Sequence, residues 1–288
     1  MLLPPGVRAQ SPAAPAKAAD RVPVLVELFT SEGCPHCPEA DALLERLFTA
    51  QSVGGAEIVA LEEHVDYWDR PAWTDHYASP AYTERQKNYA DALELDSLYT
   101  PQMVIDGLME FVGNSESRVR TAIATLGHAP KGVVQLKPQA PGAAGQKSPM
   151  PLRIAASIDL PAGHAASEVY MVVAEDKLFS RVQGGSNAGE SWPHSSVARS
   201  FHRVGAIAEG QQHFSGTIEV GLPGDDGKWQ NLRVILFAQE KDDRHVVAIR
   251  SARLAEFVPG AADAGAEAPP AAPKVAPVSS KPAGPAPR

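Results

Sequence analysis

Cysteine is scarce in this chain of 288 residues, which holds only two. Two cysteines cannot form the several bridges that hold a small secreted scaffold together. No second cysteine pair is present to complete a structural zinc site. Both lie in the segment Cys34-Pro35-His36-Cys37, so the two thiols stand three positions apart. The pattern indicates a dithiol–disulfide pair that can change its redox state.

Long hydrophobic runs and basic clusters are also missing. No run of about 18 apolar residues occurs, so no integral membrane span is predicted. The net charge of −8 and the absence of a Lys/Arg cluster argue against nucleic acid as a partner. Hydrophobic residues make up 44% of the chain and charged residues 21%, a composition that favours a packed core.

The composition divides the chain into two predicted domains between two tails. Residues 1–21 and 259–288 are rich in Ala and Pro and are predicted to be disordered. The first of these tails is too short and too interrupted by proline for a complete signal peptide, although it could be the remnant of one. Residues 22–128 alternate strand and helix patterns, whereas residues 129–258 carry strand patterns.

The first domain is predicted to have the element order of thioredoxin. Strand patterns cover residues 24–29, 57–61, 103–105 and 109–112, and helical patterns cover 38–48, 80–95 and 119–126. In the second domain apolar and polar residues alternate over 152–160, as in a half-buried strand. The predicted fold class is therefore α/β, a thioredoxin-like domain followed by a β-rich, sandwich-like C-terminal domain.

Cys34 is the predicted attacking thiol and Cys37 the more buried resolving thiol. The helix that follows offers free N–H groups and the positive end of its dipole, which lower the pKa of a thiol exposed at its amino end. His36 adds a titratable positive charge beside the thiolate, which favours the reduced form and makes the disulfide a stronger oxidant. A structural or metal-binding CxxC is the alternative interpretation.

Pro101 is predicted to follow a cis peptide bond. Thr100-Pro101 stands directly before the strand at 103–105, where thioredoxin-like folds place a cis-proline opposite the CxxC. Few X–Pro bonds are cis, so the position rather than the residue type supports this prediction. Thr100 and Pro101 are then expected to contact a substrate peptide.

Glu27 is a candidate proton acceptor because it interrupts an otherwise apolar strand. If buried, its carboxyl would have a raised pKa and could exchange a proton with Cys37 through water. The alternative is that Glu27 lies on an exposed face of the strand.

Polar and aromatic residues follow the second strand, at the predicted sheet edge that carries the CxxC. Tyr67 and Trp68 are expected to form a wall of a substrate groove there. His64 with Asp66 and Asp69 has irregular spacing and no fourth ligand, so no metal site is predicted.

His194 and His202 belong to the second predicted domain. They are interpreted as surface histidines, with a ligand role as the alternative.

Three segments resemble the motifs of one protein family. Residues 26–41 (VELFTSEGCPHCPEAD), 64–69 (HVDYWD) and 99–107 (YTPQMVIDG) are similar to those of a family of uncharacterised bacterial secreted proteins with a thioredoxin-like domain, and 196–199 (SVAR) is similar to a fourth block. The Cys-Pro-His-Cys centre resembles that of periplasmic disulfide oxidases. The chain departs from those enzymes by lacking their large helical insertion and by having a β-rich C-terminal half.

The predicted function is that of a thiol–disulfide oxidoreductase of the cell envelope, periplasmic or secreted. Its expected partners are proteins with thiols or disulfides and an unidentified redox partner, and no cofactor is expected. His36 favours net oxidation of the substrate. Two alternatives remain: a Cu(I)-binding or metallochaperone-like module that uses the CxxC, and a redox-regulated interaction protein.

Overall fold

The computed structural model describes residues 21–139, 152–220 and 229–257. The predicted disordered tails lie outside these ranges, apart from residue 21. In the described ranges no helix has both the length and the apolar character needed to cross a membrane. The elements are β1 (Pro23–Thr30), α1 (Pro38–Ala50), β2 (Ser52–Val53), β3 (Ala56–His64), η2 (Asp66–Trp68), α2 (Pro80–Ala92), β4 (Gln102–Ile105), β5 (Met109–Val112), α3 (Glu116–Leu126), β6 (Val133–Pro138), β7 (Leu152–Asp159), β8 (Ser167–Glu175), β9 (Leu178–Arg181), η3 (Gly185–Asn187), β10 (Ser191–His194), β11 (Val197–Ile207), β12 (His213–Val220), η4 (Trp229–Asn231), β13 (Leu232–Glu240), β14 (Val246–Arg253) and η5 (Leu254–Phe257).

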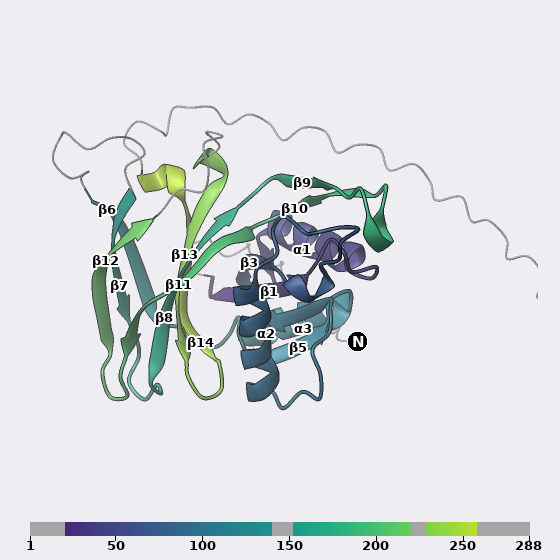
Figure 1. Cartoon of the computed structure of the whole chain (residues 1–288). Coiled ribbons are helices and arrows are strands. Elements are labelled where there is room, and N and C mark those ends of the chain that lie inside the picture. The colour runs from purple at the N-terminus through teal and green to yellow at the C-terminus, as the bar shows by residue number, and fades with distance from the viewer. Residues whose placement is uncertain (1–20, 140–151, 221–228, 258–288) are drawn as a thin grey trace, which may run out of the picture.

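One mixed sheet of nine strands runs through both halves of the chain (Figure 1). Its order is β14-β13-β8-β11-β3-β1-β4-β5, with β2 paired to β3. β1 pairs parallel with β3 and antiparallel with β4. β11 joins the other side of β3 through the parallel pair Val197 and Glu62.

The predicted fold class is wrong. The structure is mostly β-strand, with 45% strand and 23% helix, and the strands assigned to a separate sandwich extend the sheet of the first half. The junction is held by backbone and side-chain hydrogen bonds. Glu62 N donates to Ser196 O (3.0 Å), and Ser196 Oγ donates to Ala60 O (2.7 Å). These buried groups find partners only when β11 lies beside β3.

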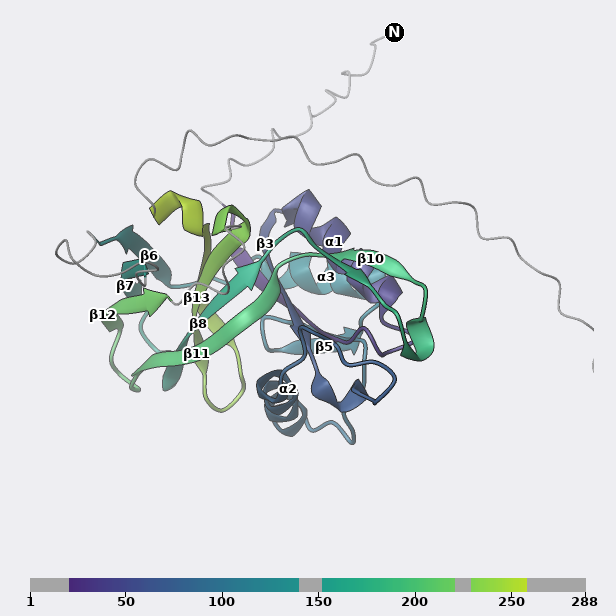
Figure 2. The same ribbon diagram turned by 45° about the horizontal axis from the view of Figure 1, so that its top comes forward.

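Alternation along β1 determines which helices cover which face of the sheet. Successive strand side chains point to opposite faces, so Val26 and Leu28 pack with α1 and α3, whereas Phe29 packs with Tyr89 of α2. Beyond β3, a three-stranded sheet in the order β12-β7-β6 supplies the apolar cluster that covers β8, β13 and β14 (Figure 2).

A two-stranded hairpin leaves the main sheet between β8 and β11. It consists of β9 and β10 joined by a segment that contains η3, and residues 178–194 are called the arm below. The arm reaches over the amino-terminal half of the protein, where β10 contacts α1 (Figures 1 and 2).

Substituting Gly107 tests the contact between the β4–β5 turn and the β13–β14 turn. Gly107 has φ of 78°, and an added Cβ would lie 1.8 Å from Arg244 O. Gly163 has φ of 90°, but a Cβ there meets nothing within 4 Å. Both changes to Ala carry the cost of left-handed backbone, about 1 kcal/mol. We expect G107A to lower the free energy of unfolding by a further amount of about 1–3 kcal/mol. Urea unfolding curves measure the difference, and equal losses in the two variants would contradict the close contact.

Candidate functional site

The two cysteines form a disulfide in the turn that precedes α1. The Sγ atoms of Cys34 and Cys37 are 2.26 Å apart and the Cα atoms 5.4 Å apart. Cys37 N donates to Cys34 O (3.3 Å), which closes the turn. The helix begins at Pro38, with Cys37 as its amino-terminal cap. The structure thus confirms that the spacing brings the two sulfurs together.

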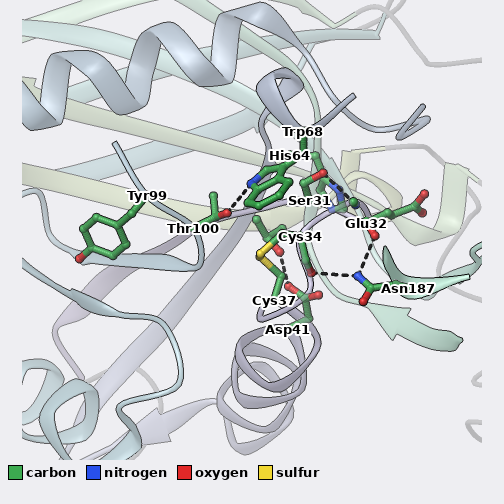
Figure 3. Close-up of a disulfide and its surroundings, with 12 residues drawn as sticks. Ser31, Glu32, Cys34, Cys37, Asp41, His64, Trp68, Tyr99, Thr100 and Asn187 are labelled. Atoms are coloured by element: carbon green, nitrogen blue, oxygen red, sulfur yellow. Dashed lines mark hydrogen bonds between the residues drawn. A yellow bond between two sulfur atoms is a disulfide. The ribbon is translucent and has the colours of Figure 1, made fainter. Parts of the chain in front are cut away.

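The expectation that Cys34 lies exposed is wrong. Both cysteines have 0% of their surface exposed, and only Pro35 and His36 between them reach solvent. The loop lies beneath segments distant in sequence. Asn187 of the arm donates to Cys34 O and to Glu32 O (both 2.9 Å). In Figure 3, Trp68 and Thr100 lie on one side of the disulfide and Asn187 on the other.

The predicted substrate-binding residues meet around Thr100. Trp68 Nε1 donates to Thr100 Oγ1 (2.6 Å), so these two residues meet near the disulfide (Figure 3). The Thr100–Pro101 bond is cis, as expected, and Pro101 is buried. The Tyr67 hydroxyl donates to Gln86 Oε1 of α2 (3.1 Å), and a side-chain interaction with Thr100 also connects Tyr67 to this group.

Gly33 is required by the close approach of η2 to the loop. A Cβ at Gly33 would lie 3.1 Å from Trp68 O and 3.2 Å from Trp68 Cβ. Glycine at this position therefore allows the Trp68 backbone to pack directly against the segment that leads into Cys34.

The structure does not bring Glu27 to the disulfide. Glu27 is fully buried, so the alternative of an exposed strand face is also wrong. Its neighbours in β1 face α1, and Glu27 therefore faces α2. There it accepts hydrogen bonds from Arg85 Nε (2.6 Å) and from the Tyr89 hydroxyl. Of the two positions that the sequence left open for Glu27, the structure shows the buried one, but on the face of the sheet away from the disulfide.

Asp41 is the buried carboxyl on the disulfide side, and sequence reasoning missed it. It lies one helical turn after Cys37, and Asp41 N donates to Cys37 O (3.0 Å). Thr30 Oγ1 donates to Asp41 Oδ1 (2.6 Å), whereas Oδ2 is buried with no hydrogen-bond partner. Burial, together with the negative charge of Glu62, raises the pKa of Asp41 to about 7. Figure 3 shows its side chain next to the disulfide. The sequence did contain a signal for this residue: Asp41 is the fourth residue after Cys37 and lies beside the apolar face of α1, which indicates a buried acid near the cysteines.

A second group of buried polar residues lies behind the cysteine loop. Glu62 Oε1 is 3.1 Å from His64 Nε2 and 2.5 Å from His194 Nδ1. His64 Nδ1 contacts Asp75 Oδ2 (2.7 Å), and His194 Nε2 contacts Ser180 Oγ (2.8 Å). The prediction of a surface position for His194 is wrong, because only 1% of it is exposed. His64, predicted near a groove, is fully buried, whereas His202 is exposed as expected.

Opposite charges offset the cost of burial in this cluster. Burial by itself raises the pKa of Glu62 and of Asp75, but the neighbouring histidines outweigh it and lower each pKa to about 2. Burial lowers the pKa of His64, but Asp75 and Glu62 raise it well above its usual value. Glu62 likewise raises the pKa of His194 against the effect of burial. The cluster therefore favours charged side chains in the interior.

Glu32 connects the cluster to the cysteine loop. Its backbone N donates to Asp75 Oδ2 (2.8 Å), and its carboxylate accepts from Trp73 Nε1 (2.9 Å) and from Ser180 Oγ. Glu32 is two residues before Cys34, so the arm, the cluster and the disulfide loop share one continuous set of hydrogen bonds.

The fold and the site define a class of protein with a single CxxC disulfide buried between a mixed sheet and an arm. The chain belongs to the family described as "Protein of unknown function (DUF1223)", whose model matches residues 25–239. The expected resemblance to an uncharacterised family is thus confirmed, while the family supplies no activity. No curated protein matches the chain.

Two solved structures share this fold. One is a protein from Agrobacterium tumefaciens with 22% sequence identity and a TM-score of 0.61, covering 79% of this chain and 92% of that one. The other is HBP35 of Porphyromonas gingivalis, with 13% identity and a TM-score of 0.61, covering 85% of this chain and 79% of that one. At these identities the likeness concerns the fold alone.

Asp41 predicts a specific dependence of stability on pH. Its pKa is raised in the folded protein, so the folded state binds the proton more tightly than the unfolded chain does. The contribution of Asp41 to stability therefore falls as the pH rises from about 4 to about 7. We expect D41N, which cannot ionise, to lose less stability than the wild type over this range in metal-free buffer. The matched control is E39Q, an exposed acid of the same helix turn. Denaturant unfolding of the oxidised proteins measures the effect, and parallel curves for wild type and D41N would contradict the raised pKa.

Proposed function

We propose that the protein is a thiol–disulfide oxidoreductase that acts on thiols or disulfides of other proteins through Cys34 and Cys37. The observation that carries the proposal is the position of Asp41. A buried carboxyl with one unpartnered oxygen and a pKa of about 7 lies one turn from Cys37, beside the disulfide. A cross-link with a purely structural role has no use for a proton donor or acceptor tuned to neutral pH.

The exchange proceeds in two steps. A substrate thiolate attacks Sγ of Cys34, the Cys34–Cys37 bond breaks, and Cys37 leaves as a thiolate. Asp41 provides a proton to this thiolate and takes one back in the reverse direction. A second substrate thiolate then attacks the mixed disulfide and releases Cys34. The substrate loses two electrons and two protons, and the protein gains them as two thiols. A disulfide of the redox partner accepts them in the next cycle.

Burial of the sulfurs means that exchange needs a local opening. Trp68 and Thr100 cover one side of the loop and Asn187 the other (Figure 3). Asn187 is attached only through the arm, a two-stranded hairpin outside the main sheet. Movement of the η3 segment at the tip of the arm would uncover the loop of Cys34, and it would leave both the nine-stranded sheet and the contact of His194 with Glu62 intact.

The proposed location is the cell envelope, periplasmic or secreted. The disulfide supports it, since such bonds persist mainly in oxidising compartments. Net oxidation of substrates remains the proposed direction, supported by the exposed His36 between the two cysteines.

Redox titration of the full chain tests the proposal. The protein is equilibrated in dithiothreitol and glutathione buffers of graded potential while the free thiols and the circular dichroism are followed. We expect reversible reduction with the fold retained, and transfer of the disulfide to a reduced dithiol peptide. D41N should slow this transfer at neutral pH by about tenfold or more, with E39Q unchanged. Reduction that occurs only together with unfolding would assign the bond a structural role instead.

Substituting Asn187 tests how strongly the arm limits access to the disulfide. Its side chain donates two hydrogen bonds to the loop, each worth about 1 kcal/mol. We expect N187A to be reduced by dithiothreitol about tenfold faster than wild type, because the opening costs less. N114A removes an exposed hydrogen bond to Glu39 instead and should leave the rate unchanged. Equal rates in all three proteins would show that the arm does not cover the reactive sulfur.

A further inference from the structure

Three ligand-type atoms converge in the buried cluster behind the cysteine loop. His64 Nε2, His194 Nδ1 and one carboxylate oxygen of Glu62 lie within 4.8 Å of one another. Glu62 and His64 come from the end of β3, and His194 comes from β10 of the arm. All three side chains have 1% or less of their surface exposed. Two imidazoles and one carboxylate are a donor set that binds divalent transition metals.

The outer atoms of these residues are already held by other partners. His64 Nδ1 donates to Asp75 Oδ2, which directs the lone pair of neutral Nε2 towards Glu62. Ser180 uses its hydroxyl proton on Glu32, so its oxygen accepts from His194 Nε2 and leaves Nδ1 facing Glu62. The second Glu62 oxygen accepts from Ser195 N (3.1 Å). Such outer hydrogen bonds orient the ligands in protein metal sites.

We propose that Glu62, His64 and His194 form a binding site for one divalent transition-metal cation, with zinc as the best chemical fit. If both histidines are neutral, the lone pairs of His64 Nε2 and His194 Nδ1 both face the negatively charged Glu62 Oε1 and are repelled by it. Each nitrogen–oxygen contact is therefore favourable only when a positively charged group lies between the two atoms. Two protons provide those charges, and one divalent cation provides the same total. Zinc–ligand distances are about 2.0–2.2 Å, so the Glu62 oxygen, which lies 2.5 Å from His194 Nδ1 and 3.1 Å from His64 Nε2, would have to move away from the nitrogens to make room for the ion.

A surface pocket gives a route to the site. A pocket of about 190 Å³ beside the arm is lined in part by Glu32, Tyr77 and Ser180. Ser180 contacts His194, and the Tyr77 ring packs edge-on against the rings of both His64 and His194. The wall of the pocket carries the Glu32 carboxylate and also Arg181. Displacement of Ser180 and Tyr77 would therefore admit an ion without opening the main sheet.

Metal titration of the full chain tests the site independently of the redox proposal. The protein is stripped with a chelator, oxidised, and titrated with zinc by calorimetry, and then with cobalt(II) to follow its visible absorption. We expect one equivalent of zinc and a cobalt spectrum typical of nitrogen and oxygen ligands. The C34S/C37S double variant should bind equally well. Loss of binding in that variant would assign the metal to the cysteines and overturn the proposal.

Variants of the ligands and of their supports complete the experiment. The H194A variant should no longer bind one equivalent of zinc. The H202A variant, which changes an exposed histidine, should still bind it. S180A removes only the outer partner of His194 and should weaken zinc binding by about tenfold. Should H194A fail to fold, S180A and the cobalt spectrum still decide the matter. The proposal would be overturned if the folded wild type bound no zinc. It would also be overturned if the S180A variant and the H194A variant both bound zinc with unchanged affinity.

Discussion

The buried carboxylate of Glu62 is the constraint on which the rest of the site depends. It lies at the junction of β3 and β11 and contacts His64 from its own strand, His194 from the arm, and Ser195 N directly after the arm. A buried charge without partners would cost several kcal/mol. The amino-terminal half therefore needs the arm to satisfy Glu62, and the arm that arrives for this purpose also covers the disulfide. The same arm carries Asn187, whose two hydrogen bonds hold it against the loop of Cys34.

Two groups of buried acids with different properties lie near the cysteine loop. On the α1 side, Asp41 lies beside the disulfide with a pKa near neutrality and one unpartnered oxygen. Behind the loop, the negative charge of Glu62 is stabilised by its contacts with His64 and His194. Glu32 joins the two regions, because it precedes Cys34 closely and contacts Ser180 of the arm.

Most helices and strands could be predicted from the sequence, whereas the order of the strands in the sheet could not. The helix from Pro38 and the strands β1 and β3 were predicted because apolar periodicity is a local property. The joining of β3 to β11 brings together residues more than a hundred positions apart, and no local pattern encodes it. The arm strands were missed because they are short and half exposed. The sequence left buried and exposed positions open for Glu27, and an isolated strand pattern does not tell which face of the sheet meets α1. The buried acid on the disulfide side, Asp41, was therefore overlooked.

Capture of covalent partners in cells tests the redox role most directly. C37S keeps Cys34 and removes the thiol that resolves a mixed disulfide, so substrates remain attached. A redox centre predicts discrete complexes that disappear on reduction and that C34S/C37S does not form. An absence of such complexes above the level of the double variant, with C37S folded and present in the cell envelope, would contradict the role of Cys34 in disulfide exchange.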